Sequence, residues 1–169
     1  MEIRPAAATD VEVITGIYNH AVENTTASFD LAPRTVADRS SWLAARSERH
    51  PVLVAVEDER VIGWGALSPY SERPAYDATT EISIYVHPEH QRRGVGRVLS
   101  RALMELAPSL GVHMIVARIC TETVGSIAMV RSLGFTEAGT VHEVGRKFGR
   151  WLDVVSWEYR VPDTDRPPV

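Results

Sequence analysis

Residues 81–111 constrain the fold more than any other segment, because an alternating run passes through a glycine-rich turn into a helical run. In EISIYV (81–86), polar or aromatic residues alternate with isoleucine and valine, which is typical of a strand with two different faces. The run VLSRALMELAPSLG (98–111) has the apolar spacing of an amphipathic helix that ends near Gly111. A strand therefore passes directly into a helix through HPEHQRRGVGR (87–97).

The turn before this helix is suited to bind an anion. Backbone N–H groups at the start of a helix are unpaired and lie at the positive end of its dipole. Glycine lets a ligand approach the backbone closely, and Arg92, Arg93 and Arg97 add positive charge, so a diphosphate fits this turn. The alternative is a tight turn whose glycines only satisfy backbone torsions and whose arginines are solvated, since short glycine patterns are weak evidence.

The rest of the pattern predicts further helices and strands. A helix is expected over 8–25 with a capping box formed by Thr9 and Glu12, and a second helix begins at a cap formed by Thr35 and Asp38. The other expected elements are a hairpin around 57–60, a loop over 69–80, a buried strand over 112–120, a short helix over 124–134 and closing strands over 135–146 and 153–161.

Composition indicates an ordinary globular protein. Of the 169 residues, 44% are hydrophobic and 24% are charged, and we expect one domain over 1–161 and a disordered tail over 162–169. A formal net charge of -4 argues against a nucleic-acid binder that depends on phosphate contacts. No apolar run approaches the roughly 18 residues of a membrane span, and the N-terminus lacks the apolar core of a signal peptide. We therefore expect a cytoplasmic protein that binds neither nucleic acid nor membranes.

The motif QRRGVG (91–96), between a strand and a long helix, resembles the coenzyme A diphosphate loop of the GNAT acyltransferase superfamily. The order of the expected elements is similar to that fold along nearly the whole chain. The resemblance implies an α+β fold of three layers, with a mixed central sheet of about seven strands flanked by about four helices. It also implies that acetyl-CoA is the cosubstrate.

The same resemblance implies where acetyl-CoA binds. Backbone groups at the end of the 81–86 strand would bond the pantetheine arm as an added strand does, and amides of the turn would hold the diphosphate. Thr123 stands where the family has asparagine, which weakens the expected amide contact. The implied cofactor-binding residues are Tyr85, Val86, His87, Gln91, Arg92, Arg93, Gly94, Val95, Gly96, Arg97, Thr123, Ser126 and Ser132.

Three separate stretches resemble one subgroup, the phosphinothricin N-acetyltransferases and the related methionine sulfoximine and methionine sulfone acetyltransferases. They are IYNHAVENTTASFD (17–30), RPAYDATTEISIYVHPEHQRRGVG (73–96) and GRKFGRWLDVVSWE (145–158). The resemblance implies an enzyme that acetylates the α-amine of a small amino acid or analogue and that forms a homodimer. It also implies structural or dimer-contacting roles for the subgroup residues Lys147, Trp151 and Asp153.

Glu81 is the candidate general base. The α-ammonium of an amino acid is mostly protonated at pH 7, so a base must take a proton before the nitrogen can attack a thioester. Glu81 shares a strand face with Ser83 and Tyr85, and the proposed base of the subgroup falls on it; the alternative is a surface glutamate at a strand end. Tyr85 is a candidate proton donor or a lining residue, and the Val86 N–H is a candidate to polarise the thioester carbonyl.

The acceptor site follows from the subgroup resemblance. Arg73 suits a carboxylate or oxyanion because a guanidinium binds it through two N–H groups, although a solvated loop arginine is the alternative. Ser71 and Val130 stand where phosphinothricin enzymes carry a second cation and a histidine, which puts phosphinothricin itself in doubt. The implied acceptor-binding residues are Phe29, Arg73, Tyr76, Ser83 and Tyr85.

Other chemistry is not indicated. Cys120 lies in the apolar run MIVARIC and is expected to be a buried thiol, which favours direct transfer over an acetyl-enzyme. The histidines and carboxylates show no ligand spacing that suggests a metal. Two alternatives stay open: an acetyltransferase for a peptide N-terminus, a lysine or a polyamine, and a non-catalytic module that binds acetyl-CoA. A doubly wound mononucleotide protein is disfavoured, because the βαβ repeat and a Walker-type lysine are missing from the sequence.

Overall fold

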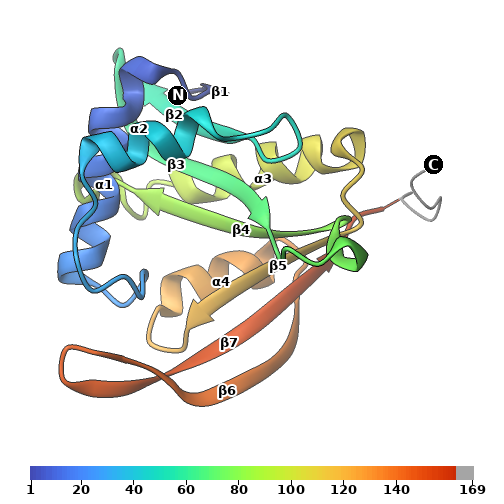
Figure 1. Cartoon of the computed structure of the whole chain (residues 1–169). Coiled ribbons are helices and arrows are strands. Elements are labelled where there is room, and N and C mark those ends of the chain that lie inside the picture. The colour runs from blue at the N-terminus through green and yellow to red at the C-terminus, as the bar shows by residue number, and fades with distance from the viewer. Residues whose placement is uncertain (163–169) are drawn as a thin grey trace.

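The computed structural model describes residues 1–162, so the predicted disordered tail falls almost wholly outside the described residues. A seven-stranded mixed sheet forms the centre, in the order β1-β2-β3-β4-β5-β7-β6 (Figure 1). Among the strands of residues 1–162, only the β4–β5 pair is parallel. The strands are β1 (Glu2–Pro5), β2 (Val52–Glu57), β3 (Arg60–Pro69), β4 (Thr79–Val86), β5 (Met114–Cys120), β6 (Thr136–Lys147) and β7 (Arg150–Arg160).

Helices cover both faces of the sheet, which confirms the predicted three-layer α+β fold (Figure 1). The α-helices among the described residues are α1 (Val11–Asn24), α2 (Val36–Ala44), α3 (Val95–Leu106) and α4 (Val124–Ser132). Short 3-10 helices include η1 (Ala8–Asp10), η2 (Pro74–Tyr76) and η3 (Pro88–His90). The predicted helices, strands and hairpin are therefore present, with ends shifted by a few residues.

The two predicted helix caps have different outcomes. At α2, the Thr35 hydroxyl accepts the Asp38 N–H at 3.0 Å and the Asp38 carboxylate accepts the Thr35 N–H, so this capping box is confirmed. At α1, the box expected from Thr9 and Glu12 is wrong. Asp10 instead accepts the Ala7 N–H at 2.8 Å and pairs with Arg4, so η1 precedes the helix.

The alternation of β4 divides the hydrophobic core into two parts. Ile82 and its even-numbered neighbours pack with α3 and α4, against buried residues such as Leu99 and Leu103. Tyr85 packs on the opposite face with Trp64 and Ile14 of α1. The predicted two-faced strand is therefore confirmed. Burying each large side chain contributes roughly 2 kcal/mol, and the two clusters hold β4 firmly from both sides.

The sheet opens between β4 and β5. Their parallel pairing covers only three residues of β4 and ends at Glu81, opposite Val116. Beyond that point the β3 side of β4 stays paired as far as Val86, and β5 continues along β7 to Cys120. Figure 1 shows β4 and β5 diverging above the β6–β7 hairpin. The split exposes one edge of a central strand inside the molecule.

Candidate active site

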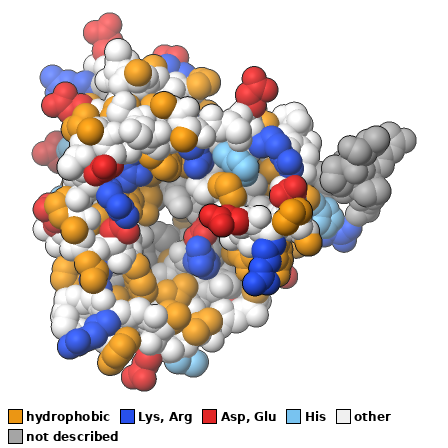
Figure 2. All heavy atoms as spheres, viewed as in Figure 1, with side chains coloured by type: hydrophobic (Ala, Val, Ile, Leu, Met, Phe, Trp, Pro, Cys, Tyr) orange, Lys and Arg blue, Asp and Glu red, His pale blue; other side chains and the backbone are white. Residues whose placement is uncertain are grey.

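A cavity of about 640 Å³ occupies the split between β4 and β5. Figure 2 shows a hollow near the middle of one face of the molecule, with charged side chains on its border. The lining comes from α1 and the loop after it, β4, α3, β5, α4 and the β6–β7 hairpin, so segments far apart in the sequence meet here. The polar and charged side chains that line the cavity include Tyr18, Thr26, Ser28, Asp30, Glu81, Ser83, Tyr85, Arg118, Cys120, Thr123, Ser126 and Ser156.

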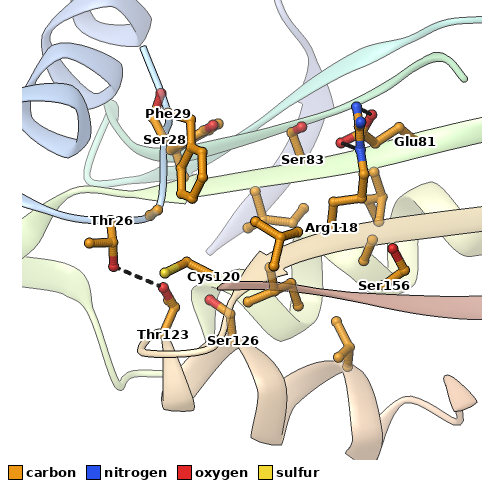
Figure 3. A pocket seen from close by; sticks show the side chains of 18 of the residues that line it. Thr26, Ser28, Phe29, Glu81, Ser83, Arg118, Cys120, Thr123, Ser126 and Ser156 are labelled. Carbon is orange, nitrogen blue, oxygen red and sulfur yellow. Dashed lines mark hydrogen bonds and ion pairs between the residues drawn. The ribbon is translucent and has the colours of Figure 1, made fainter. Parts of the chain in front are cut away.

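Glu81, the candidate base, lines this cavity with an arginine beside it. Nε of Arg118 donates to Oε1 of Glu81 at 3.0 Å, and Nη2 donates to Oε2. The pair lies at one end of the pocket, opposite Thr26 and Thr123 (Figure 3). The carboxylate raises the pKa of Arg118, so its guanidinium stays charged. Sequence reasoning missed Arg118, although a charged residue inside the apolar run MIVARIC was a signal.

The loop between α1 and α2 forms one wall of the pocket. Phe29 lines the cavity and lies against Gly145 of the β6–β7 hairpin, where an added Cβ atom would overlap the aromatic ring. The hydroxyl of Thr26 lies 3.5 Å from that of Thr123 (Figure 3). Nζ of Lys147 donates to the carbonyls of Thr25 at 2.8 Å and Ser28 at 2.6 Å. The hairpin therefore holds this loop against the cavity.

Asp30 is a second carboxylate of the pocket, but it already has partners. Nε of Arg34 donates to it at 2.8 Å and the Tyr18 hydroxyl donates at 2.7 Å. The Arg34 hydrogen bond holds the pKa of Asp30 below its usual range. Asp30 is thus a poorer proton acceptor than its position alone suggests.

Tyr85 lines the pocket with an aromatic ring that is otherwise enclosed. It stacks on Trp64 at 4.9 Å between centroids and meets Tyr18 edge-on at 5.0 Å. Burial strongly raises the pKa of Tyr85. A phenol with a raised pKa gives up its proton reluctantly, so this setting suits a lining role better than a proton donor.

The unpaired edge of β4 offers backbone groups to a ligand. The N–H of His87 donates to the Ile62 carbonyl at 2.9 Å, so this amide is engaged within the sheet. Strand alternation gives Tyr85 the same direction toward β3, whereas Ile84 and Val86 direct their backbone groups into the split. Of the three residues predicted to contact the pantetheine arm, Tyr85, Val86 and His87, only Val86 therefore directs its backbone groups into the split.

The predicted diphosphate turn lies at the exposed start of α3. Gly94 has φ 84°, a left-handed conformation that favours glycine, and it directly precedes the helix. A Cβ at Gly96 would lie 3.2 Å from Sδ of Met129, so this glycine lets α3 approach α4. Arg93 is bound to Glu57 at 2.9 Å, whereas Arg92 and Arg97 are exposed. The N–H of Val98 donates the hydrogen bond that starts the helical ladder, to the carbonyl of Gly94. The N–H groups of 95–97 come before it, as they do at helix starts that bind anions.

Of the three predicted positions around α4, two line the cavity. Thr123 and Ser126 do so, whereas Ser132 is exposed and donates to the Met129 carbonyl at 2.7 Å, which is a local helix contact. Cys120 is buried, as predicted, and it also faces the cavity, which the sequence did not reveal (Figure 3). Its thiol therefore lies beside the predicted cofactor path.

Two predicted acceptor residues lie elsewhere. Arg73 and Tyr76 belong to the exposed loop between β3 and β4 and are absent from the cavity lining, unlike Phe29, Ser83 and Tyr85. Arg73 caps the start of η2, and Tyr76 packs on Tyr70 with centroids 5.4 Å apart. The two tyrosines of this loop therefore pack on each other, outside the cavity lining.

Within residues 1–162, a single group of side chains has the spacing of a metal site: His87, Glu89 and His90, whose ligand atoms lie within 4.8 Å of one another. Nη1 of Arg93 lies 2.8 Å from Nδ1 of His90, so a guanidinium already supplies positive charge there. This turn adjoins the start of α3 and lies outside the cavity lining.

Residues 14–135 match the model of the acetyltransferase (GNAT) family. The chain belongs to this family. The family, the fold and the enzyme class predicted from the sequence, an N-acetyltransferase, are therefore confirmed. Among the helices of residues 1–162, none has the length and apolar character needed to cross a bilayer.

Relatives of this GNAT chain extend over its full length. An L-methionine sulfoximine/L-methionine sulfone acetyltransferase of Salmonella typhimurium is 38% identical over 168 residues, which cover 99% of this chain and 98% of that protein. A phosphinothricin N-acetyltransferase of Streptomyces coelicolor is 34% identical and covers 94% of this chain and 95% of its own length.

Solved GNAT structures agree with this fold. The acetyltransferase yncA from Salmonella typhimurium, solved with its cofactor acetyl-CoA, has a TM-score of 0.96 and 37% identity, and the match covers 100% of this chain and 98% of that one. A ribosomal-protein-alanine N-acetyltransferase from Brucella melitensis has a TM-score of 0.92 and 37% identity over 95% of this chain and 99% of that one. The open edge of β4 and the glycine turn before α3 together fit a molecule with a diphosphate and an extended amide arm.

Proposed function

We propose that this GNAT enzyme transfers the acetyl group of acetyl-CoA directly to the α-amine of a small amino acid or amino-acid analogue. The observation that carries the proposal is the carboxylate of Glu81, which lines the cavity at the opening between β4 and β5. The relatives named for methionine sulfone, methionine sulfoximine and phosphinothricin support an acceptor of this size.

Different residues of the chain would bind different parts of acetyl-CoA. The amides of 91–97 and the exposed Arg92 and Arg97 would hold the diphosphate, and Ile84 and Val86 would align the pantetheine arm. Thr123 and Ser126 would contact the same arm from α4. When bound, acetyl-CoA supplies an activated acetyl group and a thiolate leaving group.

At the acceptor end, the proposed chemistry needs one proton acceptor and one oxyanion donor. Glu81 takes a proton from the α-ammonium, which frees the nitrogen lone pair to form the C–N bond as the C–S bond breaks. The N–H of Val86 stabilises the developing oxyanion. Phe29, Ser83 and Tyr85 shape the acceptor space without changing charge. The reaction as proposed uses no metal.

The test measures the release of the coenzyme A thiol with each amine of a panel of candidate acceptors. It contains the twenty amino acids, methionine sulfone, methionine sulfoximine, phosphinothricin, spermidine and a short peptide. Turnover of amino acids or their analogues above peptide and spermidine is the expected result. Calorimetric binding of acetyl-CoA without turnover of any amine would instead support a non-catalytic module.

A peptide N-terminus is the second candidate acceptor, because the Brucella structure is named for that activity. The pocket favours the smaller acceptor, since the loop carrying Phe29 closes one side and is held there by Lys147. Preferred turnover of an alanine-terminated peptide over every free amino acid would reverse this order.

A homodimer in the cytoplasm is the proposed state of the enzyme. Four large apolar side chains of the β6–β7 hairpin are at least half exposed: Val141, Val144, Phe148 and Trp151. Figure 2 shows hydrophobic side chains gathered on the lower part of this face. Exposed apolar side chains gathered on one hairpin are suited to contact with a protein partner. Light scattering after size exclusion would show a dimer, and Trp151→Glu would shift it toward monomer.

A further inference from the structure

Arg118 occupies a position from which it can bind the acceptor. It follows Val116, the partner of Glu81 in the β4–β5 ladder, by two residues, so both charged side chains lie on the same face of the sheet. Figure 3 shows the two side chains meeting across the opening between the strands. The contact uses Nε and Nη2 of the guanidinium.

Among the described residues that line this cavity, Arg118 is the single cationic side chain. The lining has two carboxylates, Glu81 and Asp30, and Asp30 is already paired with Arg34. A ligand therefore meets one positive charge, on Arg118, beside one negative charge, on Glu81. An α-amino acid carries the complementary arrangement, an ammonium and a carboxylate on one carbon atom.

The guanidinium has donors left for a second anion. An arginine side chain carries five N–H donors, and the two hydrogen bonds to Glu81 leave about three. The Arg118 side chain is 55% exposed, whereas that of Glu81 is 20% exposed. An incoming carboxylate can therefore reach Arg118 from the open side without first removing Glu81.

We infer that Arg118 binds the α-carboxylate of the acceptor while Glu81 receives its α-ammonium. The inference rests on the proposed function and narrows its substrate class to free α-amino acids. Acceptors without a carboxylate beside the amine, such as spermidine or a peptide N-terminus, offer no negative charge for Arg118 to bind. Arg118 replaces Arg73 in the predicted role, because Arg73 lies on an exposed loop outside the cavity lining.

The experiment compares L-methionine sulfone with its α-carboxamide, which keeps the amine and loses the negative charge. The value of kcat/KM is measured for both acceptors in the parent, Arg118→Gln, Arg118→Lys and Arg73→Gln, and is corrected for the free-base fraction of each amine. Arg150→Gln is the matched control, because Arg150 forms a similar two-donor pair with Glu122, is 53% exposed and lies outside the cavity lining.

The parent is expected to prefer the acid over the amide by roughly 10- to 100-fold, the effect of one charged hydrogen-bonded contact. Arg118→Gln should reduce this ratio to about threefold or less by lowering acid turnover, and Arg118→Lys should retain part of it. Arg150→Gln should keep the parent ratio. An unchanged ratio in Arg118→Gln, or a ratio lost only in Arg73→Gln, overturns the inference.

Calorimetric binding of the same two acceptors, in the presence of coenzyme A, separates the inference from the proposed function. If the parent binds the acid better than the amide but acetylates neither, the assignment of Arg118 is supported and the proposed reaction is wrong. A parent that binds both equally, or neither, overturns the Arg118 assignment. A thermal melt of each variant checks that the exposed substitutions leave the fold intact.

Discussion

Lys147 on β6 fastens the loop after α1 through its ammonium, which donates to the carbonyls of Thr25 and Ser28. It is the only lysine of the chain and is 4% exposed, and burial lowers its pKa. Burying an ammonium costs free energy unless it is hydrogen-bonded, and the two carbonyls supply these hydrogen bonds. The contacts therefore tie the loop to β6. The hairpin thus shapes one wall of the cavity as well as forming the edge of the sheet.

Replacing this ammonium should loosen the pocket wall. Lys147→Met keeps the apolar stem and removes both hydrogen bonds, so we expect a loss of about 2 kcal/mol in the free energy of unfolding and a higher acceptor KM. Urea unfolding and steady-state kinetics measure the two effects. Arg146→Met, at the exposed neighbouring position, should change the free energy by less than about 0.5 kcal/mol. Equal effects of the two variants would contradict the anchoring role.

The close contact between Gly145 and Phe29 predicts a change in the acceptor KM without a change in acetyl-CoA affinity. Gly145→Ala places a methyl group where the Phe29 ring lies, so the ring must swing away. We expect the acceptor KM to rise by roughly tenfold, in line with the loss of one aromatic contact, while calorimetric affinity for acetyl-CoA stays near that of the parent. Gly16→Ala, an exposed helical position with open space around it, should instead raise the melting temperature slightly.

Much of the fold could be predicted because its signals are local. The strand, glycine turn and helix between 79 and 106 combine two different periods with a left-handed glycine, and these features depend on neighbours in sequence. The α1 cap failed for the opposite reason. Asp10 is drawn to Arg4 on β1, six residues away, and this contact outweighs the local preference for a box at Thr9.

The site was less predictable because it depends on contacts across the split sheet. Glu81 and Phe29 could be placed from the family resemblance, whereas the partnership of Glu81 with Arg118 requires the register of two parallel strands. The position of Arg73 outside the cavity lining has the same origin, since no local rule shows which way a twelve-residue loop (69–80) folds. The facing of Cys120 toward the cavity likewise depends on where β4 and β5 diverge.

The base assignment predicts a pH-dependent defect in Glu81→Gln. An amide cannot accept the ammonium proton, so turnover near pH 7 should fall by roughly 100-fold and recover partly as the pH rises and the free amine becomes populated. Acetyl-CoA affinity should stay nearly unchanged. Glu122→Gln, which disrupts a comparable ion pair outside the cavity lining, serves as the control. If Glu81→Gln turns over like the parent from about pH 6 to pH 9, another group is the base.

The Arg4–Asp10 pair predicts part of the acid sensitivity of the fold. The Arg4 hydrogen bonds lower the pKa of the buried Asp10 from its ordinary value of 3.8. A lowered folded pKa means that the unfolded chain binds the proton more readily, so the stabilisation is present above about pH 4 and is lost as the pH falls further.

Urea unfolding at pH 7 and near pH 3 tests this dependence. Asp10→Asn should be less stable than the parent by about 2 kcal/mol at pH 7 and should lose less stability on acidification, because the titrating group is gone. Glu12→Gln, an exposed position in the first turn of α1, should follow the parent at both pH values. Parallel losses in parent and Asp10→Asn would contradict the role of this pair.

The position of Cys120 makes the order of group transfer testable. Cys120 is 4% exposed yet lines the cavity, so an acetyl-enzyme would have to form on a largely buried sulfur atom at the end of β5. Direct transfer requires no thiol, and Cys120→Ala should therefore keep kcat within about threefold of the parent, with a stability loss of about 1 kcal/mol from the smaller side chain. Initial rates at varied concentrations of both substrates should give intersecting lines. Parallel lines, together with an acetylated Cys120 in the mass spectrum of enzyme mixed with acetyl-CoA alone, would instead establish a covalent intermediate.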